Sequence, residues 1–115
     1  MSVHFFRELE QIKSSLLALC MLVEEQVRDA VRALLDRDAE LAGAVEHRDR
    51  TIDQREIEIE EECLKTLALY QPVAADLRFL VAVLKINNDL ERIGDLAVNI
   101  AHSDRVQNRF RRRLW

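Results

Sequence analysis

With 115 residues, the chain has room for one domain with a single hydrophobic core. Apolar residues make up 49% and charged residues 33%, whereas only two Gly and one Pro are present, a composition that favours long helices over strands and turns. The net charge of -4 is uneven, because residues 104–115 contain five Arg and one Asp and carry +4, so residues 1–103 carry -8. An acidic body without a basic face excludes a general nucleic-acid-binding protein.

The cysteines and the N-terminus predict a soluble, cytoplasmic protein. Cys20 and Cys63 lie among aliphatic residues, where a free cysteine behaves as a small hydrophobe, and two such residues predict no disulfide framework. The first residues, MSVHFFRELEQIK, lack a basic stretch followed by an apolar run, so we expect no signal peptide. No segment approaches the roughly 18 consecutive apolar residues of a membrane span.

The first predicted helix spans about residues 4–35, because its apolar residues recur every three or four positions over about four heptads. They are Leu9, Ile12, Leu16, Leu19, Val23, Val27, Ala30 and Leu34. The helix is expected to end at residues 36–38, where Asp38 is a good N-cap for the next helix.

The second predicted helix spans residues 39–70, and an acidic ridge follows its flank. The apolar positions of this helix are Leu41, Val45, Ile52, Ile59, Cys63 and Leu67. The ridge consists of Asp49, Asp53, Glu56 and Glu60, at spacings of four, three and four. Most of the acids between residues 56 and 62 are predicted to form a solvated face.

The third predicted helix begins at Pro72, a residue favoured in the first helical turn, and ends near His102. Helical spacing gives it one apolar stripe at Ile86, Leu90, Ile93, Ala97 and Ile100. A second stripe on nearly the opposite side consists of Val73, Leu77, Val81 and Leu84. A helix that is apolar on both sides needs more than two neighbours. The sequence therefore predicts an all-α, up-down-up antiparallel three-helix bundle over residues 1–103 that self-associates, as a dimer, through the third helix and part of the first.

Acidic residues on the second and third helices are predicted to face one another. If the chain turns back at residue 72, residues at the same height have numbers that add up to about 144. Asp49 is then level with Asp95, and Asp53 is level with Glu91. Four carboxylates at one place repel one another unless protons, arginines or a metal neutralise them. Hard oxygen donors suit Mg²⁺, Mn²⁺, Ca²⁺ or iron, so these four acids are a candidate metal site.

Ion pairing with arginines is the alternative for the same acids, because arginines are plentiful on both helices. The candidates are Arg48, Arg50, Arg55 and Arg92. Gly94 lies within the acidic cluster, although a glycine inside a helix costs about 1 kcal/mol relative to Ala. It would permit the close approach of a neighbouring backbone, and close helix packing explains it equally well.

Two segments of the sequence resemble a known family, ELAGAVEHRDRTIDQREIEIEEECLKTLALYQP and QPVAADLRFLVAVLKINNDLERIGDLAVNIA. They are similar to the first repeat of the PhoU proteins, which regulate phosphate transport in bacteria and archaea, and the resemblance covers about residues 5–102. The acid-x-x-x-Asp motifs that hold metal clusters in some members of that family fall on Asp49/Asp53 and Glu91/Asp95. These are the same four acids that the comparison of heights places opposite one another on the two helices.

The resemblance implies a non-enzymatic adaptor that acts with the ATPase of the phosphate ABC transporter and with a membrane sensor kinase to repress phosphate-starvation genes. The metals implied are divalent or iron-type ions. Family members usually contain two such repeats and this chain contains one, which favours a homodimer that rebuilds the two-repeat body.

The residues themselves leave two other functional classes to consider. A carboxylate-bridged metalloenzyme of the bundle type uses Glu-x-x-His motifs, and no Glu of this chain has a His three places later. No Ser-His-Asp set, phosphate-binding Gly loop or nucleophile motif is present either, so we predict no enzymatic activity. The second class is a helical dimerisation module without metal.

The C-terminal tail, residues 104–115, lies outside the resemblance. Its sequence, DRVQNRFRRRLW, has apolar residues every four positions between arginines. As a helix it would be basic and amphipathic, which predicts a weak, salt-sensitive contact with a membrane surface or an acidic protein, and no role in folding.

Overall fold

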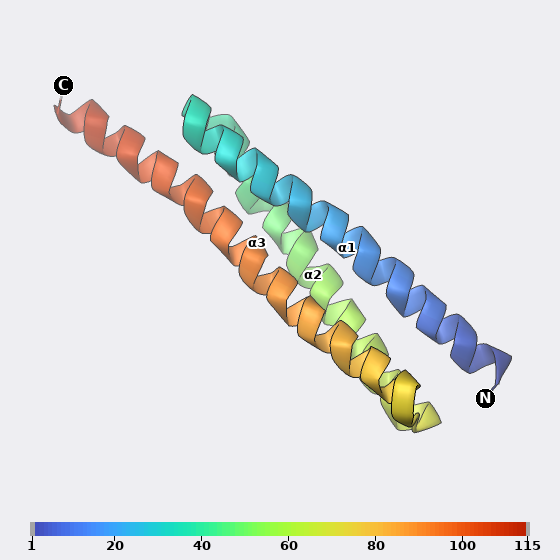
Figure 1. Ribbon diagram of the computed structural model, residues 1–115. Helices are drawn as coiled ribbons and strands as arrows, with labels where there is room; N and C mark the ends of the chain where they lie inside the picture. Colours follow the sequence, from blue (N-terminus) through green and yellow to red (C-terminus); the bar gives the residue numbers. More distant parts are fainter. Residues whose placement is uncertain (1, 115) are drawn as a thin grey trace.

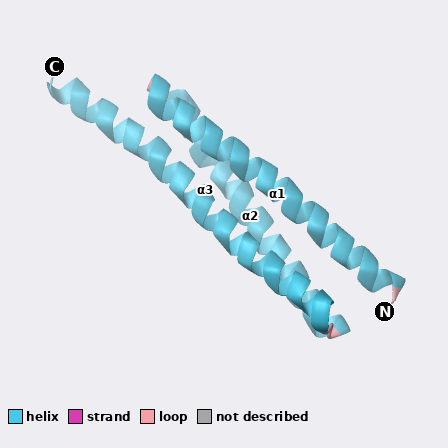
Figure 2. Ribbon diagram, viewed as in Figure 1, coloured by secondary structure: helices cyan, strands magenta, loops and turns pink. Residues whose placement is uncertain are grey.

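Three long helices form an antiparallel up-down-up bundle in which each helix contacts the other two (Figure 1). The computed structural model describes the backbone of residues 2–114 and the side chains of residues 2–103. The helices are α1 (Val3–Asp36), α2 (Ala39–Tyr70) and α3 (Ala74–Leu114). Within residues 2–114, loops occur only before α1 and in the two short connections (Figure 2), and the bundle measures 67 × 18 × 16 Å. The predicted all-α three-helix bundle is confirmed.

Short polar side chains begin the first two helices. The Ser2 hydroxyl accepts a hydrogen bond from the Phe5 N–H (3.2 Å), and an Asp38 carboxylate oxygen accepts one from the Leu41 N–H (3.0 Å). Asp38 is therefore the N-cap of α2, as predicted. Both helices end on a residue in the left-handed conformation, Arg37 (φ 53°) and Gln71 (φ 45°). Glycine is the residue that adopts this conformation at least cost, so each of these C-caps stores strain of about 1 kcal/mol.

The predicted ends of the third helix are wrong at both sides. The helix begins at Ala74, so Pro72 lies in the connection before it and not in its first turn. At the other end the backbone stays helical to Leu114 and does not stop near His102. No Gly or Pro occurs between residues 103 and 114, so the local sequence offers nothing that would end the helix earlier. The contacts predicted for the tail lie outside the described side chains.

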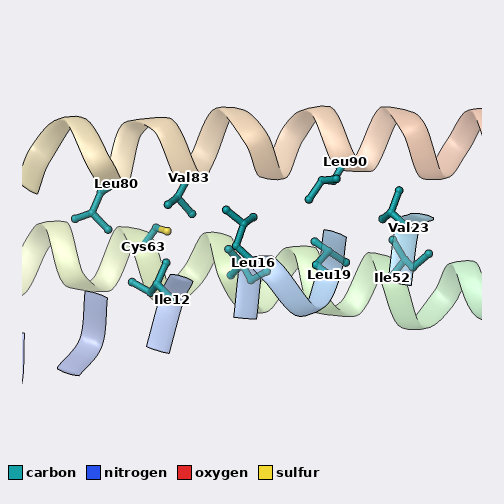
Figure 3. Close-up of a cluster of buried hydrophobic side chains, with 10 residues drawn as sticks. Ile12, Leu16, Leu19, Val23, Ile52, Cys63, Leu80, Val83 and Leu90 are labelled. Atoms are coloured by element: carbon teal, nitrogen blue, oxygen red, sulfur yellow. The ribbon is translucent and has the colours of Figure 1, made fainter. Parts of the chain in front are cut away.

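The core has two parts of different character. Along most of the bundle large aliphatic side chains from all three helices interlock (Figure 3). They include Ile12, Leu16, Leu19, Val23, Ile52, Ile59, Leu80, Val83 and Leu90. Towards the α1–α2 connection the core narrows to small side chains, namely Ala30, Ala33, Ala42, Val45, Ala97 and Ala101. Small side chains leave room for close approach of the helices beside the candidate site.

The buried face of α3 lies between the two stripes predicted for it. Its aliphatic residues are Leu80, Val83, Leu90, Ala97 and Ala101. Only Leu90 and Ala97 belong to a predicted stripe. Ile86 (43% exposed), Ile93 (40%) and Val81 (39%) face solvent within the single chain. The correction has a simple cause, since α1 and α2 cover α3 from one side only.

Two buried amides cross-link the helices and fix their register. The Gln26 side chain of α1 donates a hydrogen bond to the Val45 carbonyl of α2 (2.8 Å). The Asn87 side chain of α3 donates one to the Glu56 carbonyl, also on α2 (3.0 Å). A shift of either helix would break these bonds and leave buried polar groups unpaired, which is costly. The second bond holds α2 and α3 together beside the candidate site.

Candidate metal centre

A groove of about 590 Å³ runs between α2 and α3 and carries most of the acidic residues predicted for the site. One wall is formed by Asp53, Glu56, Ile57, Glu60 and Leu64 of α2. The other is formed by Leu84, Asn87, Asn88, Glu91 and Asp95 of α3. The groove thus combines carboxylates and side-chain amides, which are oxygen donors, with a few apolar residues at its edge.

Three of the four predicted ligands come together in space. Asp49, Asp53 and Asp95 each offer one carboxylate oxygen, and these oxygens lie within 4.8 Å of one another. Asp49 and Asp53 are one helical turn apart on α2, and Asp95 reaches them from α3. The arrangement follows from the antiparallel pairing of the two helices, as the equal heights of these residues predict.

Burial and the neighbouring charges raise the pKa values of Asp49 and Asp53. Burial raises the pKa of Asp49 to about 6, and the charges of Asp53 and Asp95 add to the effect. Burial also raises the pKa of Asp53, with Asp95 as the second cause. Without a metal the carboxylates of the three aspartates repel one another, and this repulsion is one reason why the pKa values of Asp49 and Asp53 are raised. A bound cation would reverse that repulsion.

Arginines do not neutralise the predicted acids within the part of the chain whose side chains are described. Arg48 pairs instead with α1, where it contacts Asp29 (2.9 Å) and Glu25 (3.8 Å). No ion pair to Asp49, Asp53, Glu91 or Asp95 forms among residues 2–103. One oxygen of Asp49, Oδ1, is moreover buried without a hydrogen-bond partner. A cluster of unpaired carboxylates with an unsatisfied buried oxygen fits a hard cation such as Mg²⁺, Mn²⁺, Ca²⁺ or iron.

The fourth predicted ligand, Glu91, lies in the same groove but outside the group of three aspartates. Its charge is the leading electrostatic influence on Glu56, a residue that the sequence did not single out as a ligand. Since α2 and α3 run antiparallel, Glu56 and Glu91 are each about one turn along from the aspartates, towards the α2–α3 connection.

Glu56 is a buried acidic residue of the groove that was not predicted as a ligand. Its side chain is only 6% exposed, and its Oε1 atom has no hydrogen-bond partner. Burial raises its pKa to about 8, with further contributions from Glu91 and the three aspartates. The only signal in the sequence was its place on the acidic ridge, three residues after Asp53, where it was assigned to a solvated face.

Gly94 is buried beside the aspartates, yet the space around it would admit a methyl group. A Cβ atom at this position would lie 3.6 Å from Cγ2 of Ile52 and 3.7 Å from Oδ1 of Asp49. Both distances are ordinary van der Waals contacts. Close approach of a neighbouring backbone therefore does not require glycine here.

The fold and the groove together define a three-helix bundle protein with a carboxylate-lined face, and comparison with known proteins gives it a family. The model of the PhoU domain matches residues 16–103, and the chain belongs to the PhoU family. The predicted resemblance is confirmed.

Curated relatives are similar over most of this chain. The phosphate-specific transport system accessory protein PhoU homolog of Pseudomonas putida is 50% identical over 100 residues, which are 87% of this chain and 39% of the relative. The homolog of Aquifex aeolicus is 46% identical over 96 residues, 84% of this chain and 43% of the relative. The chain thus spans about two fifths of the length of the curated relatives it matches.

Solved structures agree with the fold. The crystal structure of PhoU from Pseudomonas aeruginosa superposes with a TM-score of 0.85 at 49% identity, over 87% of this chain and 48% of that one. The phosphate transport system regulatory protein PhoU from Streptococcus pneumoniae gives 0.82 at 37% identity, over 87% and 47%. Among the described residues, no helix combines the length and apolar character needed to cross a membrane.

Proposed function

We propose that this chain is a non-enzymatic regulator of phosphate transport and of phosphate-starvation signalling. The observation that carries the proposal is membership of the PhoU family, together with relatives at up to 50% identity that are named phosphate-specific transport system accessory proteins. Its partners are then the ATPase of a phosphate ABC transporter and a membrane sensor kinase, met in the cytoplasm. Residues 1–103 are assigned as the regulatory domain, and residues 104–115 as a basic tail.

A hard cation, divalent or iron-type, belongs to this function. Asp49, Asp53 and Asp95 would hold it, with Glu91 available from the same groove. When bound, the metal supplies positive charge that neutralises the carboxylates and draws α2 and α3 together. The unpaired aspartates and the buried, unsatisfied oxygen of Asp49 support this assignment.

The bundle is proposed to act as a homodimer. Exposed large apolar residues on α1 and α3 support this, among them Leu17, Met21, Ile86, Ile93 and Leu96. Sedimentation of the wild type at tens of micromolar should show a dimer, and Ile93→Glu should shift it to monomer. A wild-type monomer would overturn this part of the proposal.

A genetic experiment tests the function itself. In the organism that encodes the chain, its gene is deleted and a reporter of phosphate-starvation genes is measured in phosphate-rich medium. We expect the reporter to rise, and the wild-type gene but not the Asp49→Asn/Asp53→Asn/Asp95→Asn variant to restore repression. Glu61→Gln, which removes one exposed charge from α2, serves as the control and should restore repression. A deletion without effect on the reporter or on phosphate uptake would contradict the proposal.

A further inference from the structure

We propose that the part of the α2–α3 groove nearest the α2–α3 connection binds a basic amphipathic helix, and that this helix is the tail, residues 104–115, of a second copy of the chain. The inference concerns the groove beyond the three aspartates and does not depend on a metal. It gives the tail one particular acidic partner, which is another molecule of the same protein.

The first evidence is the composition of the groove walls. Glu60 of α2 and Glu91 of α3 are exposed on facing walls, and no Lys, Arg or His lines the groove among the described residues. Three apolar side chains lie beside these acids, namely Ile57 (49% exposed), Leu64 (51%) and Leu84. Carboxylates next to exposed aliphatic side chains fit a helix that combines cationic with apolar residues.

The second, independent evidence is the environment of Glu56. Its side chain lines the same groove, is only 6% exposed, and has an Oε1 atom without a hydrogen-bond partner. Within residues 2–103, no Lys, Arg or His forms an ion pair with Glu56, Glu60 or Glu91. A buried carboxyl oxygen normally has a donor, and the guanidinium group of an arginine offers five N–H groups in a planar fork that matches a carboxylate. An arginine-rich segment would therefore supply what these acids lack.

The sequence of the tail has the composition that this surface requires. Residues 104–115 contain five Arg and one Asp, with Val106, Phe110 and Leu114 at intervals of four. The backbone is helical to Leu114, and residues four apart share one face of a helix. The tail also has the length of the α3 wall from Leu84 to Asp95, since each corresponds to about 16 Å of helix.

The path of α3 rules out the groove of the same chain and leaves that of a second copy. The helix α3 is continuous from Ala74 to Leu114, and its end leads away from the groove, past the α1–α2 connection (Figure 1). An unbroken helix cannot fold back on itself, so the tail cannot lie along residues 84–95 of its own chain. Between two chains the charges attract, because residues 1–103 carry -8 and the tail carries +4.

An anionic membrane is the competing partner, since a basic amphipathic helix also binds lipid headgroups. A membrane would leave Glu56 and the other unpaired acids of the groove without a role. The two partners differ in whether the tail, offered as a separate peptide, finds a site on the protein.

A nuclear magnetic resonance titration of the isotope-labelled full chain with a synthetic peptide of residues 104–115 tests the inference, in EDTA and at low salt. The shifted backbone signals locate the peptide, and their concentration dependence gives its affinity. The groove variant is Glu60→Gln/Glu91→Gln. The matched control is Glu61→Gln/Asp89→Asn, which removes two exposed charges from the same helices outside the groove. Far-UV circular dichroism verifies that each variant is folded.

We expect the peptide to shift the signals of Ile57, Glu60, Leu64, Leu84 and Glu91, with an affinity that falls steeply as salt is added. The groove variant should bind the peptide about fivefold more weakly, and the control should bind it like the wild type. Shifts confined to other faces, or equal affinities of the groove variant and the wild type, would overturn the inference. A peptide that binds phosphatidylserine vesicles but leaves the spectrum of the protein unchanged would overturn it too.

The proposed dimer is tested apart from this contact. Ile93 does not line the groove, so Ile93→Glu should bind the peptide with the affinity of the wild type. A loss of peptide binding in this variant would place the tail on the dimer face and contradict the inference, whatever the state of the metal site.

Discussion

The replacement Glu56→Gln should stabilise the metal-free protein, and by an amount that grows with pH. Glu56 is buried and lines the α2–α3 groove, where burial and neighbouring acids raise its pKa from 4.5 to about 8. Between these values the folded chain holds the proton and the unfolded chain has released it. The folded state therefore binds more protons than the unfolded state, so stability falls as pH rises from about 4.5 to about 8.

The size of the effect follows from the pKa shift. A shift from 4.5 to about 8, at about 1.36 kcal/mol for each unit, corresponds to about 5 kcal/mol of lost stability once Glu56 is ionised in both states. Water in the open groove screens part of this cost, so we expect ionised Glu56 to reduce the free energy of unfolding by about 2–4 kcal/mol. Glutamine cannot ionise and has nearly the same shape. The variant should therefore match the wild type near pH 5 and exceed its stability by this amount near pH 8.5.

Urea denaturation in EDTA, followed by far-UV circular dichroism at the two pH values, measures this difference. Glu61→Gln is the control, because it removes an exposed charge from the same helix and should change stability by less than about 0.5 kcal/mol at either pH. A gain for Glu56→Gln that is equal at both pH values would show that the charge of the carboxylate is not the cause. A loss at high pH would refute the argument outright.

Four further outcomes are expected. Arg37→Gly should stabilise the protein by about 1 kcal/mol, because the backbone of Arg37 is in the left-handed conformation (φ 53°) that glycine adopts at least cost. Arg37→Ala should bring no such gain, and chemical denaturation of the two variants distinguishes these outcomes. Gly94→Ala should raise the melting temperature by the equivalent of about 0.5–1 kcal/mol, since a methyl group fits there; a loss would mean that the site is tighter than described. Ala97→Leu should cost about 1–3 kcal/mol because the position is fully enclosed among small side chains, so an unchanged melting temperature would contradict the close packing. Truncation after Asp104 should leave thermal stability unchanged but reduce sedimentation with anionic vesicles at low salt; unfolding on truncation would make the tail structural.

The first two helices and the N-cap Asp38 could be predicted because they depend on nearby residues. The periodic apolar positions of residues 4–35 and the N-cap Asp38 gave the first helix to within a residue or two, and the bounds of the second in full. The start of α3 could not be obtained in this way. Pro72 fits a first helical turn equally well, whereas α3 begins at Ala74, whose left-handed backbone (φ 51°) the sequence does not indicate.

The buried face of α3 was beyond the sequence for a different reason. Apolar residues surround much of this helix, so periodicity allows several faces, and the neighbours decide which one is buried. The helices α1 and α2 cover Leu80, Val83 and Leu90 and leave Ile86 and Ile93 exposed. Contact with a second chain would bury further residues of α3, and the sequence of one chain does not show which ones.

The candidate site was predictable as far as the antiparallel pairing could specify it. Equal heights on two helices gathered Asp49, Asp53 and Asp95 correctly, because the pairing depends only on the position of the turn. Burial of Glu56 was not predictable, since an acidic run on a helix is usually solvated and its sequence does not show which member faces inwards. Membership of the family gave no help with this residue.

Anomalous X-ray scattering from crystals of the protein soaked with Mn²⁺ tests the central claim most directly, because it locates the metal without reference to activity. The account predicts an anomalous peak between α2 and α3, about 2–2.5 Å from carboxylate oxygens of Asp49, Asp53 and Asp95. Crystals of the Asp49→Asn/Asp95→Asn variant should lack that peak. A wild-type map without density at the three aspartates, with Mn²⁺ elsewhere or nowhere, would contradict the account.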